Sequence, residues 1–203
     1  SQVNFENLIK TGFELVIEDL NISHGLVKDL FPDANVYSRF RDRPIRGGAY
    51  VQDKYEVKEF VLNLGIRADY SNPRKEWPDL VLFSDEWNEY ASPAYHADSS
   101  YSTKKAEAIL AFSPRLAISH PITENSKLFF NYGHFQQSPT NEQRFKEGRG
   151  ALGELDDFGN PDLVLEKTIS YELGFDYSIF NEYLIQVSAF YHDIFDQRSE
   201  ERF

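Results

Sequence analysis

Two amino acids are missing from this sequence, and each absence narrows what the chain can be. Among its 203 residues there is no cysteine, which excludes a disulfide framework and any metal site built on thiolates. There is also no methionine, so we expect a processed or excised part of a longer chain. The first residues lack the basic start and apolar core of a secretory signal peptide. No apolar run approaches the ~18 residues of a transmembrane helix.

Positive charge is scarce, whereas aromatic residues are abundant. The net charge is -12, and a protein that binds nucleic acid needs a basic surface, so we expect no nucleic-acid partner. Aromatic residues make up 15% of the chain. Such a content is typical of β-rich proteins and of proteins with aromatic side chains at a membrane interface.

Motifs of the common enzyme classes are missing as well. The five histidines are scattered without an H-E-x-x-H pair, and no G-x-S-x-G nucleophile motif occurs. The one G-x-G-x-x-G match, at Gly148, Gly150 and Gly153, follows the polar stretch TNEQRFKE instead of a buried strand. We therefore expect a loop there, and we predict no enzyme activity, no cofactor and no metal site.

The clearest pattern in the sequence is an alternation of apolar and polar residues. In FVLNLGIRADY, residues 60–70, every second residue is apolar. This period of two predicts a β-strand with one apolar and one polar face. The same pattern recurs in residues 165–180 and 183–194, and residues 7–20 also alternate.

The predicted strands come in pairs joined by short polar turns. Residues 47–57 and 60–70 are joined by Lys58 and Glu59, residues 109–122 and 127–135 by TENS, and residues 165–180 and 183–194 by Asn181 and Glu182. Such joints predict β-hairpins. With residues 7–20 included, the chain has about seven strands of this kind.

The connections between the pairs are long, polar and rich in Pro, Gly, Asp and Asn. They cover approximately residues 21–46, 71–108 and 136–164, and all three fall at the same end of the predicted sheet. A compact soluble domain rarely carries unstructured connections beyond ~15 residues. Short turns at one end and long loops at the other are typical of an outer-membrane β-barrel.

Strand length agrees with a membrane-spanning strand. Ten steps at ~3.4 Å and a tilt near 40° raise the chain by roughly 26 Å, against an apolar band of ~25 Å. The polar alternates suit a water-filled interior, and we predict that these residues face it: Asn63, Arg67, Asp69, Arg115, Glu172 and Asp176.

Periodicity alone does not exclude a soluble β-sandwich, in which one face of each sheet packs on a core. Four residues also depart from the pattern. Asp53 falls on an apolar face, Phe129 and Phe190 fall on polar faces, and Pro114 would remove a ladder hydrogen bond.

Three longer stretches resemble the barrel of TonB-dependent outer-membrane receptors, in the branch found in Bacteroidetes-like Gram-negative bacteria. They are YVQDKYEVKEFVLNLGIRADY, SPRLAISHPITENSKLFFNYGHFQQSP and NPDLVLEKTISYELGFDYSIFNEYLIQVSAFYHDI. The resemblance implies a 22-strand barrel that is filled by an N-terminal plug and imports a scarce nutrient. It also implies an energy-transducing TonB complex that pulls on a TonB box. About seven strands cannot close such a barrel, and we find no plug or TonB box, so we expect a segment of a larger antiparallel barrel.

Two loop regions are candidates for nutrient binding. Aromatic rings with nearby polar groups suit a sugar, a chelate ring or an apolar ligand, although such rings can equally pack the loop against its neighbours. The candidate residues are Trp77, Trp87, Tyr90, Tyr95, Phe135 and Arg144. The ligand stays open among an iron chelate, cobalamin, a glycan and a peptide.

A third loop is acidic. Residues 154–162 carry Glu154, Asp156, Asp157 and Asp162, and oxygen ligands at close spacing can hold calcium. The spacing is not that of an EF-hand, so a solvated acidic loop is the default expectation.

Two alternatives to an outer-membrane receptor that contacts lipid remain open. One is a soluble or surface-exposed β-sheet module that binds carbohydrate or protein through the same aromatic loop. The other is a passive porin-type channel. A plug domain encoded upstream would separate the receptor from the porin.

Overall fold

The computed structural model describes residues 7–26, 35–81, 83–92, 101–180 and 182–197. The elements in chain order are β1 (Asn7–Ile17), β2 (Leu20–Leu26), β3 (Val36–Asp42), β4 (Ile45–Val57), β5 (Phe60–Asn72), β6 (Glu76–Pro78), α1 (Asp85–Ala91), β7 (Thr103–Lys105), β8 (Ile109–Thr123), β9 (Ser126–Gln137), α2 (Asn141–Phe145), β10 (Glu147–Gly150), β11 (Leu155–Phe158), β12 (Glu166–Ile179) and β13 (Tyr183–Phe195). Among the described residues, no helix is long and apolar enough to cross a membrane.

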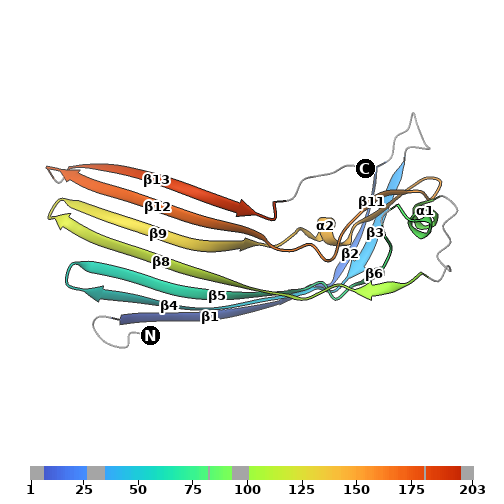
Figure 1. Ribbon diagram of the computed structural model, residues 1–203, viewed down its shortest axis with the longest axis horizontal. Coiled ribbons are helices and arrows are strands. Elements are labelled where there is room, and N and C mark those ends of the chain that lie inside the picture. Colours follow the sequence, from blue (N-terminus) through green and yellow to red (C-terminus); the bar gives the residue numbers. More distant parts are fainter. Residues whose placement is uncertain (1–6, 27–34, 82, 93–100, 181, 198–203) are drawn as a thin grey trace.

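Seven long strands form one antiparallel sheet in the order β1-β4-β5-β8-β9-β12-β13. They are 11 to 15 residues long, and they are the strands that the alternating pattern predicts. The sheet ends at β1 on one side and at β13 on the other, so it does not close on itself (Figure 1). The prediction of an antiparallel barrel segment with short turns and long loops is confirmed.

All three short turns lie at the left end of the sheet in Figure 1. Lys58 and Glu59 join β4 to β5 as predicted, and the positive φ of Lys58, 52°, is the conformation that a tight hairpin turn requires. The turn after β8 is shorter than predicted, because Thr123 pairs with Ser126 and only residues 124–125 are left outside the ladder. β12 ends at Ile179, so Phe180, which the pattern places in the strand, lies beyond its end.

The long connections lie at the opposite end and contain secondary structure that the sequence did not predict (Figure 1). Four short strands form a second sheet in the order β11-β10-β3-β2, and β6 pairs with β7. The second sheet joins distant parts of the chain, since Gly148 of β10 pairs with Ser38 of β3. We call this unit, with α1 and α2, the loop-end unit.

The buried apolar side chains lie in the loop-end unit or at its border with the main sheet. Phe40, Tyr90, Phe145 and Leu165 are each at most 5% exposed. The apolar face of the main sheet is bare by contrast: Leu64 is 49% exposed, Ile185 47% and Val187 63%, and Leu62 is half-buried. No second layer of the described chain covers these residues.

Two of the four residues that depart from the alternation have local explanations, whereas Asp53 and Phe190 stay exceptions, the latter paired with the polar Glu172. Pro114 pairs with Ile66 of β5, and the pairing of β8 with β9 begins only at Arg115, so its missing N–H falls where β8 has a partner on one side. Phe129 lies opposite Gly174, and a Cβ at Gly174 would collide with the Phe129 ring, so glycine makes room for the ring. Asp53 does lie on the apolar face, between Ile9 and Leu64.

Candidate functional site

The residues predicted to face an aqueous interior share one face of the main sheet. Asn63 pairs with Ala117 of β8, which pairs with Asn131 of β9, and Asn131 pairs with Glu172 of β12. Paired residues project to the same side, and alternate residues of each strand join them there. We call this side the polar face, and it carries Asn63, Arg67, Asp69, Arg115, Glu172 and Asp176.

Ion pairs and hydrogen bonds satisfy most of the charges on the polar face. Arg67 donates from Nε to Asp69 Oδ1 at 2.7 Å and from Nη2 to Glu14 Oε1 at 2.5 Å. Glu172 Oε2 accepts from Asn131 Nδ2 at 2.8 Å. Arg67 and Glu172 therefore each have other partners, and the two are not paired with each other.

A broad hollow of ≈ 860 Å³ lies on the polar face at mid-height of the sheet. Its wall includes Arg115 and Phe135, which the sequence assigned to separate roles. The structure brings them together, because the Arg115 guanidinium lies 4.8 Å from the centre of the Phe135 ring. Phe135 is 44% exposed, so this cation–π pair is open to a ligand.

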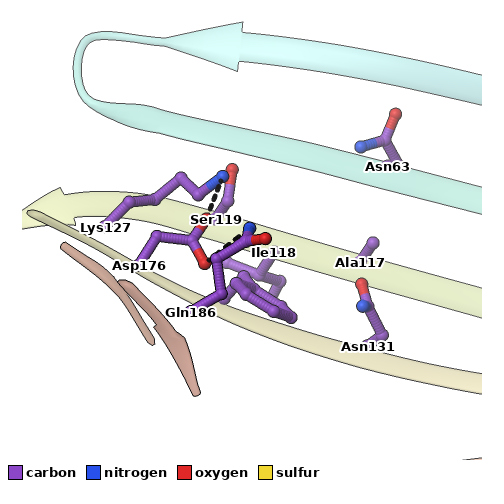
Figure 2. Close-up of a pocket in the computed structure, with 9 residues that line it drawn as sticks. Asn63, Ala117, Ile118, Ser119, Lys127, Asn131, Asp176 and Gln186 are labelled. Carbon is purple, nitrogen blue, oxygen red and sulfur yellow. Dashed lines mark hydrogen bonds and ion pairs between the residues drawn. The ribbon is translucent and has the colours of Figure 1, made fainter. Parts of the chain in front are cut away.

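A second hollow of ≈ 340 Å³ lies nearer the short turns (Figure 2). Asp176 forms its charged centre, with Lys127 Nζ at 2.8 Å and Gln186 Nε2 donating at 3.2 Å. Asn63 and Asn131 line the far side of the same hollow. The two hollows share these two asparagines, so a polar track runs along the face from one to the other.

The aromatic loop residues gather into a cluster in the loop-end unit. The ring centre of Phe158 in β11 lies 6.2 Å from Trp77, 5.7 Å from Trp87 and 5.9 Å from Tyr90. Tyr90 is 3% exposed and donates its hydroxyl to Glu147 at 3.1 Å. Burial, reinforced by the negative charge of Glu147, raises the pKa of the Tyr90 phenol, so it stays a proton donor.

Arg144 lies inside the same unit, in α2. It is 3% exposed, and its guanidinium donates to Ser71 Oγ at 2.8 Å and to the Leu163 carbonyl at 3.3 Å. Thr140 begins α2 with a capping box: its hydroxyl accepts from the Gln143 N–H, and the Gln143 side chain accepts from the Thr140 N–H. This helix therefore holds Arg144 as a bridge between the end of β5 and the approach to β12.

These positions separate the six ligand candidates into groups. Phe135 is exposed on the polar face, Trp77 and Trp87 are half-buried in the aromatic cluster, and Tyr95 lies outside the described residues. Tyr90 and Arg144 are buried, which favours the packing alternative for these two. Sequence reasoning missed Phe158, Glu147 and Arg149 around Tyr90, because nothing local shows that β10 and β11 exist.

The two other loop motifs are parts of ordinary structure. The three glycines of the G-x-G-x-x-G match lie in the β10–β11 hairpin, where Gly153 takes a φ of 95° that suits glycine. Of the acidic residues, Asp157 pairs with Lys146, and Asp162 accepts from the Glu107 N–H at 2.9 Å. Within the described ranges, no group of three or more His, Asp or Glu side chains could hold a metal ion.

Family comparison agrees with the sheet and its connections. A model of the family described as TonB dependent receptor-like, beta-barrel, matches residues 17–200. The chain belongs to this family. The resemblance predicted from its strand motifs is thereby confirmed. Receptor and transport are terms of this family, and the antiparallel sheet of the segment agrees with the β-barrel that the family name states.

A solved structure supports the fold. The segment is similar to a double mutant of the Serratia marcescens hemophore receptor HasR in complex with its hemophore HasA and heme. The TM-score is 0.55 at 14% identity, and the match covers 92% of this chain and 34% of the HasR chain. At this identity the likeness shows the fold alone. A comparison with curated proteins found no match.

Proposed function

We propose that this chain is a wall segment of an outer-membrane receptor that imports a scarce nutrient. In this assignment the apolar face of the main sheet contacts lipid, and the polar face lines the interior through which the nutrient passes. The energy-transducing TonB complex would act through parts of the receptor outside this segment. Family membership favours such a receptor over a passive porin.

The observation that carries the proposal is the bare apolar face. Its side chains include Leu64, Ile185 and Val187, about half exposed or more, on strands long enough to cross a bilayer. A soluble module would cover such a face with a second layer, since large contiguous apolar patches are rare on soluble monomers. In a bilayer, the same apolar side chains contact acyl chains and need no covering layer.

The boundary of the apolar face at the loop end runs obliquely across the sheet, as it does where the strands of a barrel are tilted in a membrane. Leu64 of β5 and Tyr191 of β13 lie in one row of paired residues, four strands apart. On the apolar face beyond this row, the first polar residue that is not aromatic is Asp193 on β13, two residues on, and Asn72 on β5, eight residues on. The boundary of the apolar band therefore lies six residues further along β5 than along β13. Six residues span ~20 Å along the strand and four strands span ~19 Å across it. A membrane surface drawn through both residues thus tilts the strands by roughly 45°, as transmembrane strands require.

Nutrient contact is proposed for two places. The Arg115–Phe135 pair is exposed on the polar face, and Trp77 and Trp87 are half-buried in the loop-end unit. Their chemistry suits an iron chelate, cobalamin, a glycan or a peptide. The Arg115 charge adds a preference for ligands with an acidic group.

Spin labels on the two faces test the proposal. This segment has no cysteine, and any cysteine elsewhere in the receptor is first replaced by serine. Single cysteines are then placed as Leu64→Cys and Val187→Cys on the apolar face, and as Asn63→Cys and Glu172→Cys on the polar face. In the receptor that carries the segment, reconstituted in lipid, the first pair should collide with dissolved oxygen and the second with an aqueous nickel chelate.

Lys105→Cys supplies the reference for full contact with water, because the Lys105 side chain is 82% exposed in β7. Equal nickel contact for Leu64→Cys and Asn63→Cys would show that water bathes both faces, and the lipid assignment would then be wrong.

A further inference from the structure

Arginines line one face of the loop-end unit, away from the hollows of the polar face. Arg39 and Arg41 alternate along β3 after Tyr37, and all three side chains are exposed. Arg43 follows just beyond the end of the strand and is exposed too. Alternate residues of a strand lie ~7 Å apart on the same face. The two arginines of β3 therefore project from the same face of the strand, two residues apart.

The other face of β3 is packed into the unit. Ser38 is 2% exposed and Phe40 5%, and the Phe40 ring lies 6.4 Å from that of Phe145 in α2. Asp42 on this face pairs with Lys75 at 2.9 Å. The inward face of the strand is thus apolar or neutralised, whereas its outward face carries the cations.

Few acidic groups balance these cations. Arg43 pairs with Asp19 at 2.8 Å, but neither Arg39 nor Arg41 has an ion pair within the described part of the chain. Their partners across the ladder on β2 are neutral: Ser23 faces Arg39, and Asn21 faces Arg41. The pKa of Asp19 is lowered, first by its hydrogen bond from Arg43 and also by the charges of Arg43 and Arg41. A positive surface therefore stands out on a chain whose net charge is -12.

We propose that this surface binds an acidic oligosaccharide, and we call it the arginine row: Arg39 and Arg41 with Tyr37, Ser23 and Asn21. Guanidinium groups bind carboxylate or sulfate groups in a bidentate manner. The 53% exposed Tyr37 ring offers an apolar face to a sugar ring, and Ser23 and Asn21 can exchange hydrogen bonds with its hydroxyls. Charge alone would suit any anion, but the ring and the neutral polar side chains beside the cations favour a charged sugar.

The arginine row deepens the proposed function and rests on it, because it names the class of nutrient that the receptor would capture. It lies at the loop end, where the long connections gather, so it would contact the ligand before the hollows do (Figure 1). Arg115 on the polar face would then meet the same acidic groups further inside.

Binding of a defined acidic sugar tests the arginine row. The probe is tetragalacturonate, added to the detergent-solubilised receptor in a calorimeter, with the uncharged maltotetraose as the comparison sugar. Arg39→Gln and Arg41→Gln should each weaken tetragalacturonate binding by about tenfold, and salt should weaken the unaltered receptor further. The exchange of both arginines for lysine should leave intermediate binding, since the charge remains but the bidentate contact is lost.

Lys105→Gln is the matched control, because it removes one positive charge from an exposed side chain of the same unit. It should leave the affinity within about twofold of the unaltered receptor. Equal binding of tetragalacturonate by the receptor and by the double glutamine variant would overturn the proposal. So would an unaltered receptor that ignores tetragalacturonate, or one that binds inorganic tripolyphosphate as tightly. The spin labels report separately on the membrane assignment, so failure of the sugar test leaves that assignment standing.

Discussion

Leu64→Arg in the lipid-reconstituted receptor is expected to lower the free energy of unfolding by about 2–4 kcal/mol, the cost of an arginine on the lipid face near the bilayer midplane. Leu64 lies near the middle of β5 on the apolar face, with Leu116 and Asp53 as its partners across the ladder. The Asp53 carboxylate can pair with the new arginine, but both charges would still be held in lipid, so we expect a loss at the lower end of this range. The arginine could not reach water without crossing several apolar rows. Urea unfolding in lipid, followed by the far-UV circular dichroism of the β-strands, measures the loss.

Asn63→Arg is the matched control for this substitution. Asn63 precedes Leu64 on the same strand, faces the opposite side and lines both hollows, so its arginine would be solvated. We expect a change within about 0.5 kcal/mol, as for other exposed sites. If both variants lose the same stability, depth in the membrane does not explain the loss, and the apolar face must meet something other than lipid.

The main sheet was predictable because its signal is local and repeated. Its strands alternate over about nine residues or more, with the few exceptions named above, and a shift by one residue would reverse the two faces, so the pattern also specifies the register. The three hairpin turns follow from the same pattern. The position of Phe129 on the polar face is explained by Gly174 on the next hairpin, which leaves room for its ring. Only the register between the two strands shows that these residues lie opposite each other.

The loop-end unit was not predictable, because its order comes from contacts between distant segments. EGRG of β10 has no strand pattern, and it becomes a strand by pairing with β3 more than a hundred residues earlier. The sequence also cannot separate an aromatic residue that grips a ligand from one that packs a loop. Tyr90 and Arg144 were chosen for chemistry that suits both roles, and their neighbours bury them. Arg39 and Arg41 gave the weakest signal of all, because alternation in so short a strand is common.

The loop-end unit should also unfold separately from the barrel wall, and Phe145→Ala tests this. Phe145 is 1% exposed and packs against Phe40, with the Lys75 ammonium 5.4 Å from its ring centre. Loss of a buried phenylalanine costs about 3–5 kcal/mol. The strands of the main sheet are held by their own hydrogen-bond ladder and are surrounded by lipid. The loss of stability should therefore stay within the loop-end unit. Hydrogen exchange should accelerate at the amides of β3, β10 and α2, while those of β5 and β12 keep their protection.

Phe83→Ala removes the same side chain from an exposed position of the same unit, since Phe83 is 73% exposed. Its exchange pattern should match that of the unaltered receptor. Accelerated exchange along β5 and β12 in Phe145→Ala would contradict the separation, because the wall would then depend on the packing above it. Confinement of the effect would mean that the connections form a preformed platform on an independent wall. In that case ligand-binding residues on the platform can change without cost to the strands that span the membrane.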